Sequence, residues 1–271
     1  MKIVFTREDA EKIMNDNSFG NIIIPEGVTA IESYAFAYCR SLTSVTIPDS
    51  VTEIGSRAFY GCSSLKSIVI PEGVKVIWYE TFSCCESLKS IVIPEGVKVI
   101  CDETFNNCIS LTSVTIPDSV TEIGERAFDY CVSLKSIVIP EGVKVICNGT
   151  FRYCKSLTSV TIPDSVTEIG ERAFMGCESL TSINIPRGVN VIKERTFLGC
   201  KSLTTVNISE GVSCIDNYAF MGCESLTSVV LPKSIRILGS QYTNSKTWGV
   251  FKLPKGYEEI NGRIYIREEC E

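Results

Sequence analysis

The prolines of this 271-residue chain recur at a fixed spacing of 23 residues. Eight of the ten are in strict register, from Pro25 to Pro186, and Pro232 and Pro254 follow the same frame closely. With each proline as position 1, nine consecutive units carry phenylalanine at position 12 and cysteine at position 15, and positions 4, 7, 18, 21 and 23 are Val, Ile or Leu. A unit with only seven apolar positions is too small to form a core alone. The repeat therefore predicts a solenoid, in which each unit buries its apolar side chains against its neighbours.

The sequence within one unit predicts the path of a coil. In "LTSVTIP" (42–48), Val45 and Ile47 alternate with hydroxyl residues, which is typical of a strand with one buried face, and Pro48 ends the strand. "SVTEIG" predicts a second short extended arm. In "ERAFDYC", Phe128 and Cys131 are three residues apart, as on a short helix. We therefore expect a strand, a corner, an extended arm and a short helix in each coil.

The repeat unit also resembles a known family. The pattern Leu-x-x-Val-x-Ile-Pro-x-x-Val-x-x-Ile-x-x-x-Ala-Phe-x-x-Cys-x-x-Leu, present over about Phe19 to Leu253, closely resembles the leucine-rich repeats of the BspA-like type. The resemblance implies a mostly β solenoid of the α/β class, a right-handed superhelix with a parallel sheet on its concave side. It also implies a role in adhesion to host proteins or to other microbes.

The two ends of the repeat array differ from its interior, as expected for caps. Residues 1–18 contain "TREDAEKIM", a short helix that Thr6 would begin, and we assign them as an N-terminal cap. Residues 19–254 form an array of about ten repeats. Residues 255–271 contain "EEINGRIYI", which predicts a hairpin with an Asn-Gly turn. Such a hairpin would cover the last open edge of the solenoid.

Charge and composition exclude several classes of partner and activity. The 26 basic and 32 acidic residues give a net charge of −6, which argues against nucleic-acid binding. No stretch approaches the ~20 apolar residues of a membrane span, and the first residues do not resemble a secretory signal. Histidine is absent, and the sequence has neither a catalytic triad nor a phosphate-binding glycine loop. We therefore expect a monomeric non-enzyme without a cofactor or membrane insertion.

Fourteen cysteines raise the possibility of disulfides or a metal site. Nine of them form the column at position 15, where a free thiol can serve as a small buried hydrophobe. Neighbouring strands ~4.8 Å apart could bring two such cysteines within reach of a disulfide, but parallel side chains are poorly oriented for one. Metal-binding Cys-x-x-Cys pairs are absent. The sequence favours a reduced column, with the off-frame Cys84, Cys101, Cys147 and Cys270 more exposed.

The candidate binding residues are those at which the repeats differ. Positions 19, 20 and 22 should face solvent on the strand side, and they are mostly Thr, Ser and Val, which are common on any exposed strand. If this face binds a protein, its distinctive residues are Lys66, Lys89, Lys135, Asn184 and Asn207.

On the convex side, Trp78 and Tyr79 replace the small or polar residues of sister repeats. Aromatic side chains of this kind are common at the centre of binding sites, but they could equally fill gaps between coils.

Two functions fit these features. The first is a protein-interaction or adhesion scaffold that binds a protein or cell-surface ligand through its concave face. The alternative is an intracellular scaffold or effector, which the many thiols and the missing signal favour. The family resemblance points to the cell surface, so the sequence leaves the location open.

Overall fold

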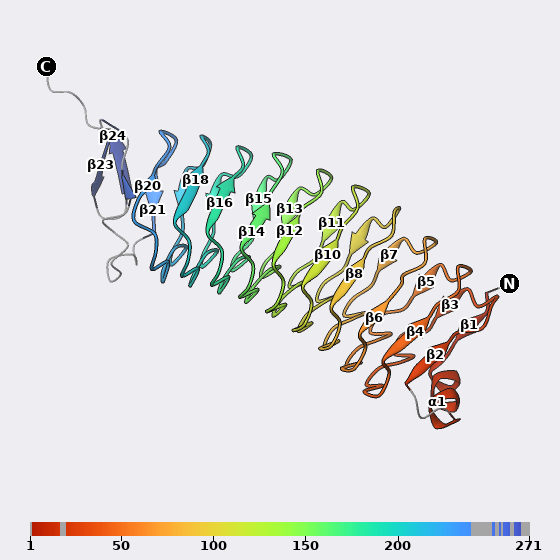
Figure 1. Cartoon of the computed structure of the whole chain (residues 1–271). Helices are drawn as coiled ribbons and strands as arrows, with labels where there is room; N and C mark the ends of the chain where they lie inside the picture. The colour runs from red at the N-terminus through yellow and green to blue at the C-terminus, as the bar shows by residue number, and fades with distance from the viewer. Residues whose placement is uncertain are drawn as a thin grey trace, which may run out of the picture.

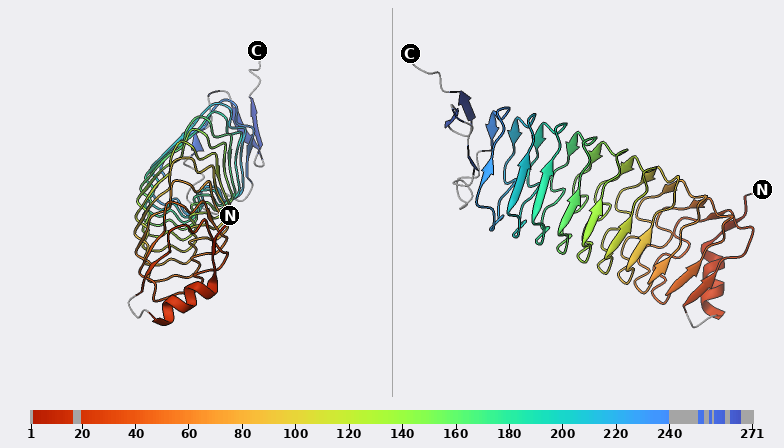
Figure 2. Two further views of the ribbon diagram at one scale, coloured as in Figure 1. Left: turned by 90° about the vertical axis from the view of Figure 1, so that its right-hand side faces the viewer. Right: turned by 45° about the horizontal axis from the view of Figure 1, so that its top comes forward.

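The computed structural model describes residues 2–16, 20–239, 251–252, 255, 257–260 and 263–266. Within these ranges the chain winds into about ten coils that stack in a single row (Figure 1). Viewed from the side turned by 90°, successive coils overlap closely in outline (Figure 2). The chain is therefore a solenoid, as the 23-residue period predicts, and its elements are mostly strands, as the family resemblance implies.

The strands predicted at positions 20–23 form one side of every coil, which we call the first sheet. Neighbouring strands pair in parallel with a shift of one repeat, as Ser90, Ile91 and Val92 pair with Ser113, Val114 and Thr115. The strands of the first sheet are β2 (Asn21–Ile23), β4 (Ser44–Thr46), β6 (Ser67–Ile68), β8 (Ser90–Val92), β10 (Ser113–Thr115), β12 (Ser136–Val138), β14 (Ser159–Thr161), β16 (Ser182–Ile185), β18 (Thr205–Ile208), β20 (Val229–Val230) and β22 (Phe251–Lys252).

The predicted extended arm is itself a strand of two residues, and these strands pair in parallel to form a second sheet. Glu122 and Ile123, for example, pair with Val99 and Ile100 of the preceding coil. The strands of the second sheet are β1 (Val4–Phe5), β3 (Ala30–Ile31), β5 (Glu53–Ile54), β7 (Val76–Ile77), β9 (Val99–Ile100), β11 (Glu122–Ile123), β13 (Val145–Ile146), β15 (Glu168–Ile169), β17 (Val191–Ile192), β19 (Cys214–Ile215) and β21 (Ile237–Leu238).

The third part of each coil differs from the expected short helix. In the described coils, positions 8–15 form consecutive turns, and positions 10 and 14 have positive φ, for example 51° at Arg126 and 58° at Tyr130. An α-helix requires negative φ at every residue, so these two positions end any helix after one turn. Alternate amides bond within the coil, as Cys131 N–H does to the Phe128 carbonyl (3.2 Å), and the others bond to the next coil, as Phe128 N–H does to the Thr150 carbonyl (2.9 Å). The turns therefore connect neighbouring coils, which a helix could not do because its amides bond internally.

The core lies between the two sheets and the turn segment, and phenylalanine is its main component. Phe36 to Phe220 are fully buried at position 12 of nine coils. Their rings stack nearly parallel, with centroids 5.0–5.6 Å apart and interplanar angles of 2–13°. Phe5 of β1 extends the stack at its N-terminal end, 5.3 Å from Phe36. Stacked rings of this kind add about 0.5–1.5 kcal/mol per pair to the burial of their surface.

The first and last elements extend the coil array at its two ends. Helix α1 (Arg7–Asp16) begins after Thr6, as expected. The Thr6 hydroxyl accepts the Asp9 amide (3.2 Å), and the Thr6 amide donates to the Asp9 carboxylate (2.9 Å), which is a capping box. At the other end, β23 (Tyr257–Ile260) and β24 (Arg263–Ile266) pair antiparallel, and β24 also pairs with β21. The expected Asn261-Gly262 turn lies outside the described residues.

Candidate interaction surfaces

The first sheet presents the predicted alternation of buried and exposed side chains. In β8, Ser90 and Val92 are exposed while Ile91 is buried, and the other strands of this sheet repeat the pattern with small variations. Positions 18, 21 and 23 face the core, and positions 19, 20 and 22 face solvent. All three predicted lysines and both predicted asparagines of this face are exposed.

Lysine and valine occur together on this face. Lys66, Lys89 and Lys135 at position 19 are each followed three residues later by Val69, Val92 or Val138, which are 79%, 63% and 64% exposed. The Lys89 amide donates to the Lys66 carbonyl (3.4 Å), so these two lysines lie on adjacent coils, and Lys135 follows two coils later. In the part of the chain that the structure describes, none of the three ammonium groups takes part in an ion pair. We call these six residues the lysine–valine patch.

The two predicted asparagines are brought into direct contact. Asn184 and Asn207 are register partners in β16 and β18, and the Asn207 amide donates to the Asn184 Oδ1 at 2.6 Å. Part of their hydrogen-bonding capacity is thus used within the sheet. A shallow depression of about 500 Å³ lies beside Asn207, between β18 and β20.

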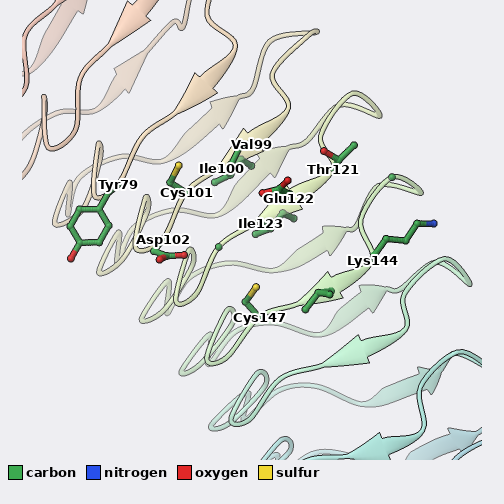
Figure 3. Close-up of a pocket in the computed structure, with 13 residues that line it drawn as sticks. Tyr79, Val99, Ile100, Cys101, Asp102, Thr121, Glu122, Ile123, Lys144 and Cys147 are labelled. Carbon is green, nitrogen blue, oxygen red and sulfur yellow. The ribbon is translucent and has the colours of Figure 1, made fainter.

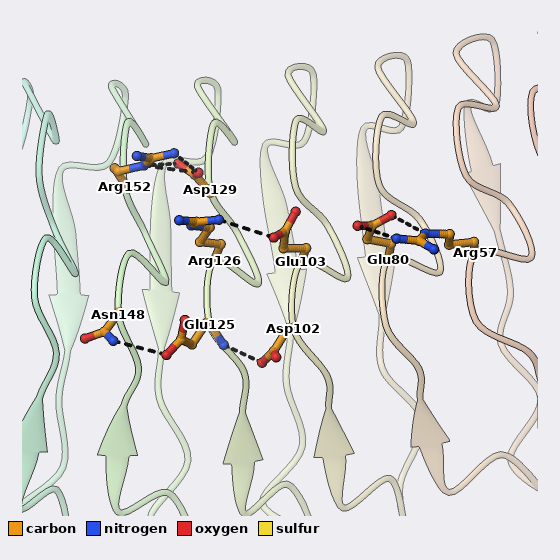
Figure 4. A network of polar contacts seen from close by, with 9 residues as sticks. All are labelled: Arg57, Glu80, Asp102, Glu103, Glu125, Arg126, Asp129, Asn148 and Arg152. Atoms are coloured by element: carbon orange, nitrogen blue, oxygen red, sulfur yellow. Dashed lines mark hydrogen bonds and ion pairs between the residues drawn. The ribbon is translucent and has the colours of Figure 1, made fainter.

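Trp78 and Tyr79 lie in the turn segment after β7 and are 43% and 36% exposed. The guanidinium carbon of Arg57 lies 4.7 Å from the centroid of the Tyr79 ring. Arg57 also makes two bonds to the carboxylate of Glu80, Nε to Oε2 at 2.5 Å and Nη2 to Oε1 at 3.1 Å (Figure 4). Burial opposes ionisation of Glu80, but the bonds from Arg57 and Tyr79 outweigh it and lower the pKa of Glu80. Tyr79 therefore covers an ion pair between coils, which favours the packing role for this residue.

A second ion pair lies deeper in the same segment. Asp129 is 1% exposed, and its carboxylate accepts hydrogen bonds from Arg152 Nε (3.0 and 3.1 Å) and from Arg152 Nη2 (2.6 Å) (Figure 4). The Arg152 guanidinium also lies against the rings of Tyr130 and Tyr153, 5.6 and 5.5 Å from their centroids. Burial raises the pKa of Asp129, and the interaction with Arg152 only partly offsets this effect. The charged groups of Arg152 and Asp129 are therefore engaged in contacts between neighbouring coils.

A groove on the side of the second sheet was not predicted from the sequence. It is an open depression of about 830 Å³ that spans β9, β11 and β13, with Tyr79 at one end (Figure 3). Val99, Ile123 and Val145 are among its apolar lining residues, Cys101 and Cys147 flank it, and Asp102, Glu122 and Lys144 supply charged groups. The available sequence signal was the run of small residues at repeat position 8, Cys101, Gly124 and Cys147.

The cysteine column is buried, as predicted, and its thiols are not paired with one another. Of its nine thiols, those from Cys62 to Cys223 are buried and that of Cys39 at the N-terminal end is half-buried, and every described cysteine is free. Each thiol from Cys62 to Cys223 donates to the carbonyl of the phenylalanine one coil earlier, at 3.1–3.2 Å. The off-frame Cys84, Cys101 and Cys147 are half-buried, more exposed than the column as expected, whereas Cys270 lies outside the described residues.

The described residues include no group of three or more His, Cys, Asp or Glu side chains that could hold a metal ion. Among these same residues, no helix has the length and apolar character needed to cross a membrane.

The chain matches one protein family model and is similar to several solved structures. The family model of the BspA-type leucine-rich repeat region matches residues 10–135 and 121–249. A leucine-rich repeat protein of T. pallidum is 37% identical over 60% of this chain and 79% of its own, with a TM-score of 0.58. A leucine-rich repeat protein from Bacteroides ovatus is 29% identical over 87% of this chain and 92% of its own (TM-score 0.42). A leucine-rich cell-surface protein from Faecalibacterium prausnitzii is 30% identical over 85% of this chain and 90% of its own (TM-score 0.40). No curated protein matches the sequence significantly.

Proposed function

Because the chain belongs to the BspA-type leucine-rich repeat family, we propose that it is a non-enzymatic scaffold that binds a protein or cell-surface ligand through the solvent face of the first sheet. Proteins of this family are generally interaction or adhesion scaffolds, and the family resemblance supports the assignment of the first sheet to the concave side. Stacked coils create a long continuous face, which suits an extended protein partner.

The observation that carries the proposal is the lysine–valine patch. Two adjacent coils, carrying Lys66 and Lys89, combine free ammonium groups with highly exposed Val69 and Val92. Exposed β-branched side chains gain free energy when a partner covers them, about 25 cal/mol per Å² of apolar surface. Unpaired lysines would favour acidic groups on that partner and increase the rate of association. The partner surface that we propose is therefore apolar at its centre, where it covers the valines, and acidic at its rim, where it meets the lysines.

Two further groups would extend this contact or lie outside it. The amide pair Asn184–Asn207 offers polar contacts farther along the same face, where its remaining donors and acceptors point to solvent. Trp78 and Tyr79 lie in the turn segment, and we propose Trp78 as the aromatic contact of that side because Tyr79 is engaged with Arg57. The net charge of −6 supports a protein partner over nucleic acid. We propose that the scaffold acts as a monomer, which sedimentation equilibrium would test.

The alternative, an intracellular scaffold, is favoured by the free thiols. Thirteen cysteines are free in the described residues, and an oxidising compartment would expose them to disulfide formation. Fractionation of cells that express the native gene distinguishes the two locations. Recovery of the protein only in the medium or on the surface would exclude the intracellular role.

Charge reversal on the first sheet tests the proposed binding face. The double variant Lys66→Glu/Lys89→Glu should lose capture of a partner from extracts of neighbouring microbes or host matrix. The matched control, Lys75→Glu/Lys98→Glu, makes the same charge change at exposed lysines of repeat position 5, away from the first sheet. Equal capture by the two double variants would contradict the proposed face, provided that circular dichroism shows both to be folded.

A further inference from the structure

The groove over β9, β11 and β13 lies on the second sheet and is separate from the face proposed above (Figure 3). Its depth comes from small side chains. Gly124 lies between Cys101 and Cys147 at repeat position 8, and a Cβ atom there would be 2.3 Å from Asp102 Oδ1 and 2.5 Å from the Asp102 amide nitrogen. Only glycine fits at this point without displacing Asp102, so the close approach of these two coils depends on Gly124.

The groove is apolar at its base. Ile100 and Ile123 are buried, and Val145 is 37% exposed. The thiols of Cys101 and Cys147 are half-buried, and burial together with nearby carboxylates raises the pKa of both. At neutral pH they are uncharged and add to the apolar surface.

The charges around this apolar base are mostly negative. Three coils carry glutamate at repeat position 6, namely Glu53, Glu122 and Glu168. Glu53 pairs with Lys2 (2.6 Å) and Glu168 with Lys193 (2.5 Å). Glu122, between Val99 and Val145 in the groove, makes no ion pair or side-chain hydrogen bond within the described chain.

Other charged groups add to this bias. Asp102 also lines the groove, and Lys144 is the one cation among its described lining residues. Glu125 and Glu168 stand close enough to act on the Cys147 thiol. A cationic ligand would be attracted here, and an anionic ligand would be repelled.

We propose that this groove binds a segment of a partner protein in which a lysine or arginine side chain is flanked by aliphatic side chains. The aliphatic groups contact Val99, Val145 and the neutral thiols, and the cation lies between the carboxylates of Glu122 and Asp102. The preference is opposite in charge to that of the lysine–valine patch. The two faces of one solenoid would therefore bind different partners, or different parts of one partner.

Fluorescence anisotropy with synthetic peptides tests the chemistry of the groove. The probe is a short fluorescein-labelled peptide that alternates lysine with valine. Two control peptides replace lysine with glutamate or valine with serine. Wild-type protein should bind the lysine–valine peptide in preference to both, more weakly at high salt because exposed charges are screened. Failure to bind it, or equal binding of the glutamate–valine peptide, would overturn the proposal.

Three single variants locate the binding site. Glu122→Lys should weaken binding of the lysine–valine peptide about three- to tenfold, and Lys144→Gln should strengthen its binding. Glu53→Lys makes the same substitution at the same repeat position three coils away, and it should leave binding unchanged. Equal weakening by Glu53→Lys and Glu122→Lys would overturn the site, since general charge would then explain binding.

Two further measurements keep the test decisive. Thermal unfolding followed by circular dichroism verifies the fold of each variant, and Lys144→Gln tests the site by itself if Glu122→Lys does not fold. Sedimentation of the protein without peptide examines a second copy as the occupant. Self-association that Glu122→Lys abolishes would replace the proposed partner with a second copy of this chain.

Discussion

Replacement of Phe128 tests the stacked core. The ring is fully buried between Phe105 and Phe151, with centroids 5.3 and 5.5 Å away. Phe128→Ala removes both stacking contacts and leaves a cavity, and such changes cost about 3–5 kcal/mol. Phe128→Asp should cost more, because an unpaired carboxylate would be buried among aromatic rings.

The location of Phe128 near the middle of the array adds a second expectation. Each coil contacts mainly its neighbours, so a damaged interior coil separates the coils before it from those after it. Urea unfolding followed by circular dichroism should therefore change from one transition to two. Val138→Ala, which alters an exposed side chain ten residues later, is the matched control and should shift stability by less than about 0.5 kcal/mol. A loss below about 1 kcal/mol for Phe128→Ala, with a single transition retained, would refute the stacked core.

Three further predictions concern the turn segment and the thiols. Arg152→Ala leaves Asp129 buried without its partner and should cost about 3 kcal/mol in chemical unfolding, whereas a loss near zero would show that Asp129 is solvated. Carboxyl NMR titration should find the pKa of Glu80 below its ordinary value. The contribution of Glu80 to folding stability is therefore fully present above the ordinary pKa and is lost as pH falls through the folded pKa. Asp129 should show the opposite pH dependence of stability. Burial raises the pKa of Asp129, so its contribution to folding stability is lost as pH rises through the folded pKa. In the native protein, Cys101 should react with a thiol reagent before the fully buried Cys131, and equal rates would contradict the buried column.

Much of the fold could be predicted because the 23-residue period directly encodes the stack. The prolines, Phe128 and its equivalents, and the cysteine column each recur at one position of the repeat, and the structure confirms their arrangement. The prediction of a short helix was wrong, because the i, i+3 spacing of Phe128 and Cys131 is equally compatible with consecutive turns. The missed signal was glycine at position 14 in Gly61, Gly176, Gly199 and Gly222, where φ is positive.

The candidate site was predictable only in part. Alternation along a strand was sufficient to place Lys66, Lys89 and Lys135 on the solvent face. The groove depends on three coils at once, since Gly124 is significant only because Cys101 and Cys147 flank it. Ion pairing is equally invisible in the sequence, where Glu53 and Glu122 occupy equivalent positions and only Glu53 has a lysine partner.

Hydroxyl-radical footprinting of the captured partner complex tests the proposed binding face most directly. With the partner at saturation, Val69 and Val92 should become protected from oxidation, because both are highly exposed in the free protein. Ile237, on the second sheet but outside the groove, is 47% exposed and serves as the internal reference for a side chain outside that face. Protection of Val69 and Val92 is the predicted result. Unchanged oxidation of both valines in a saturated complex would contradict binding through the first sheet.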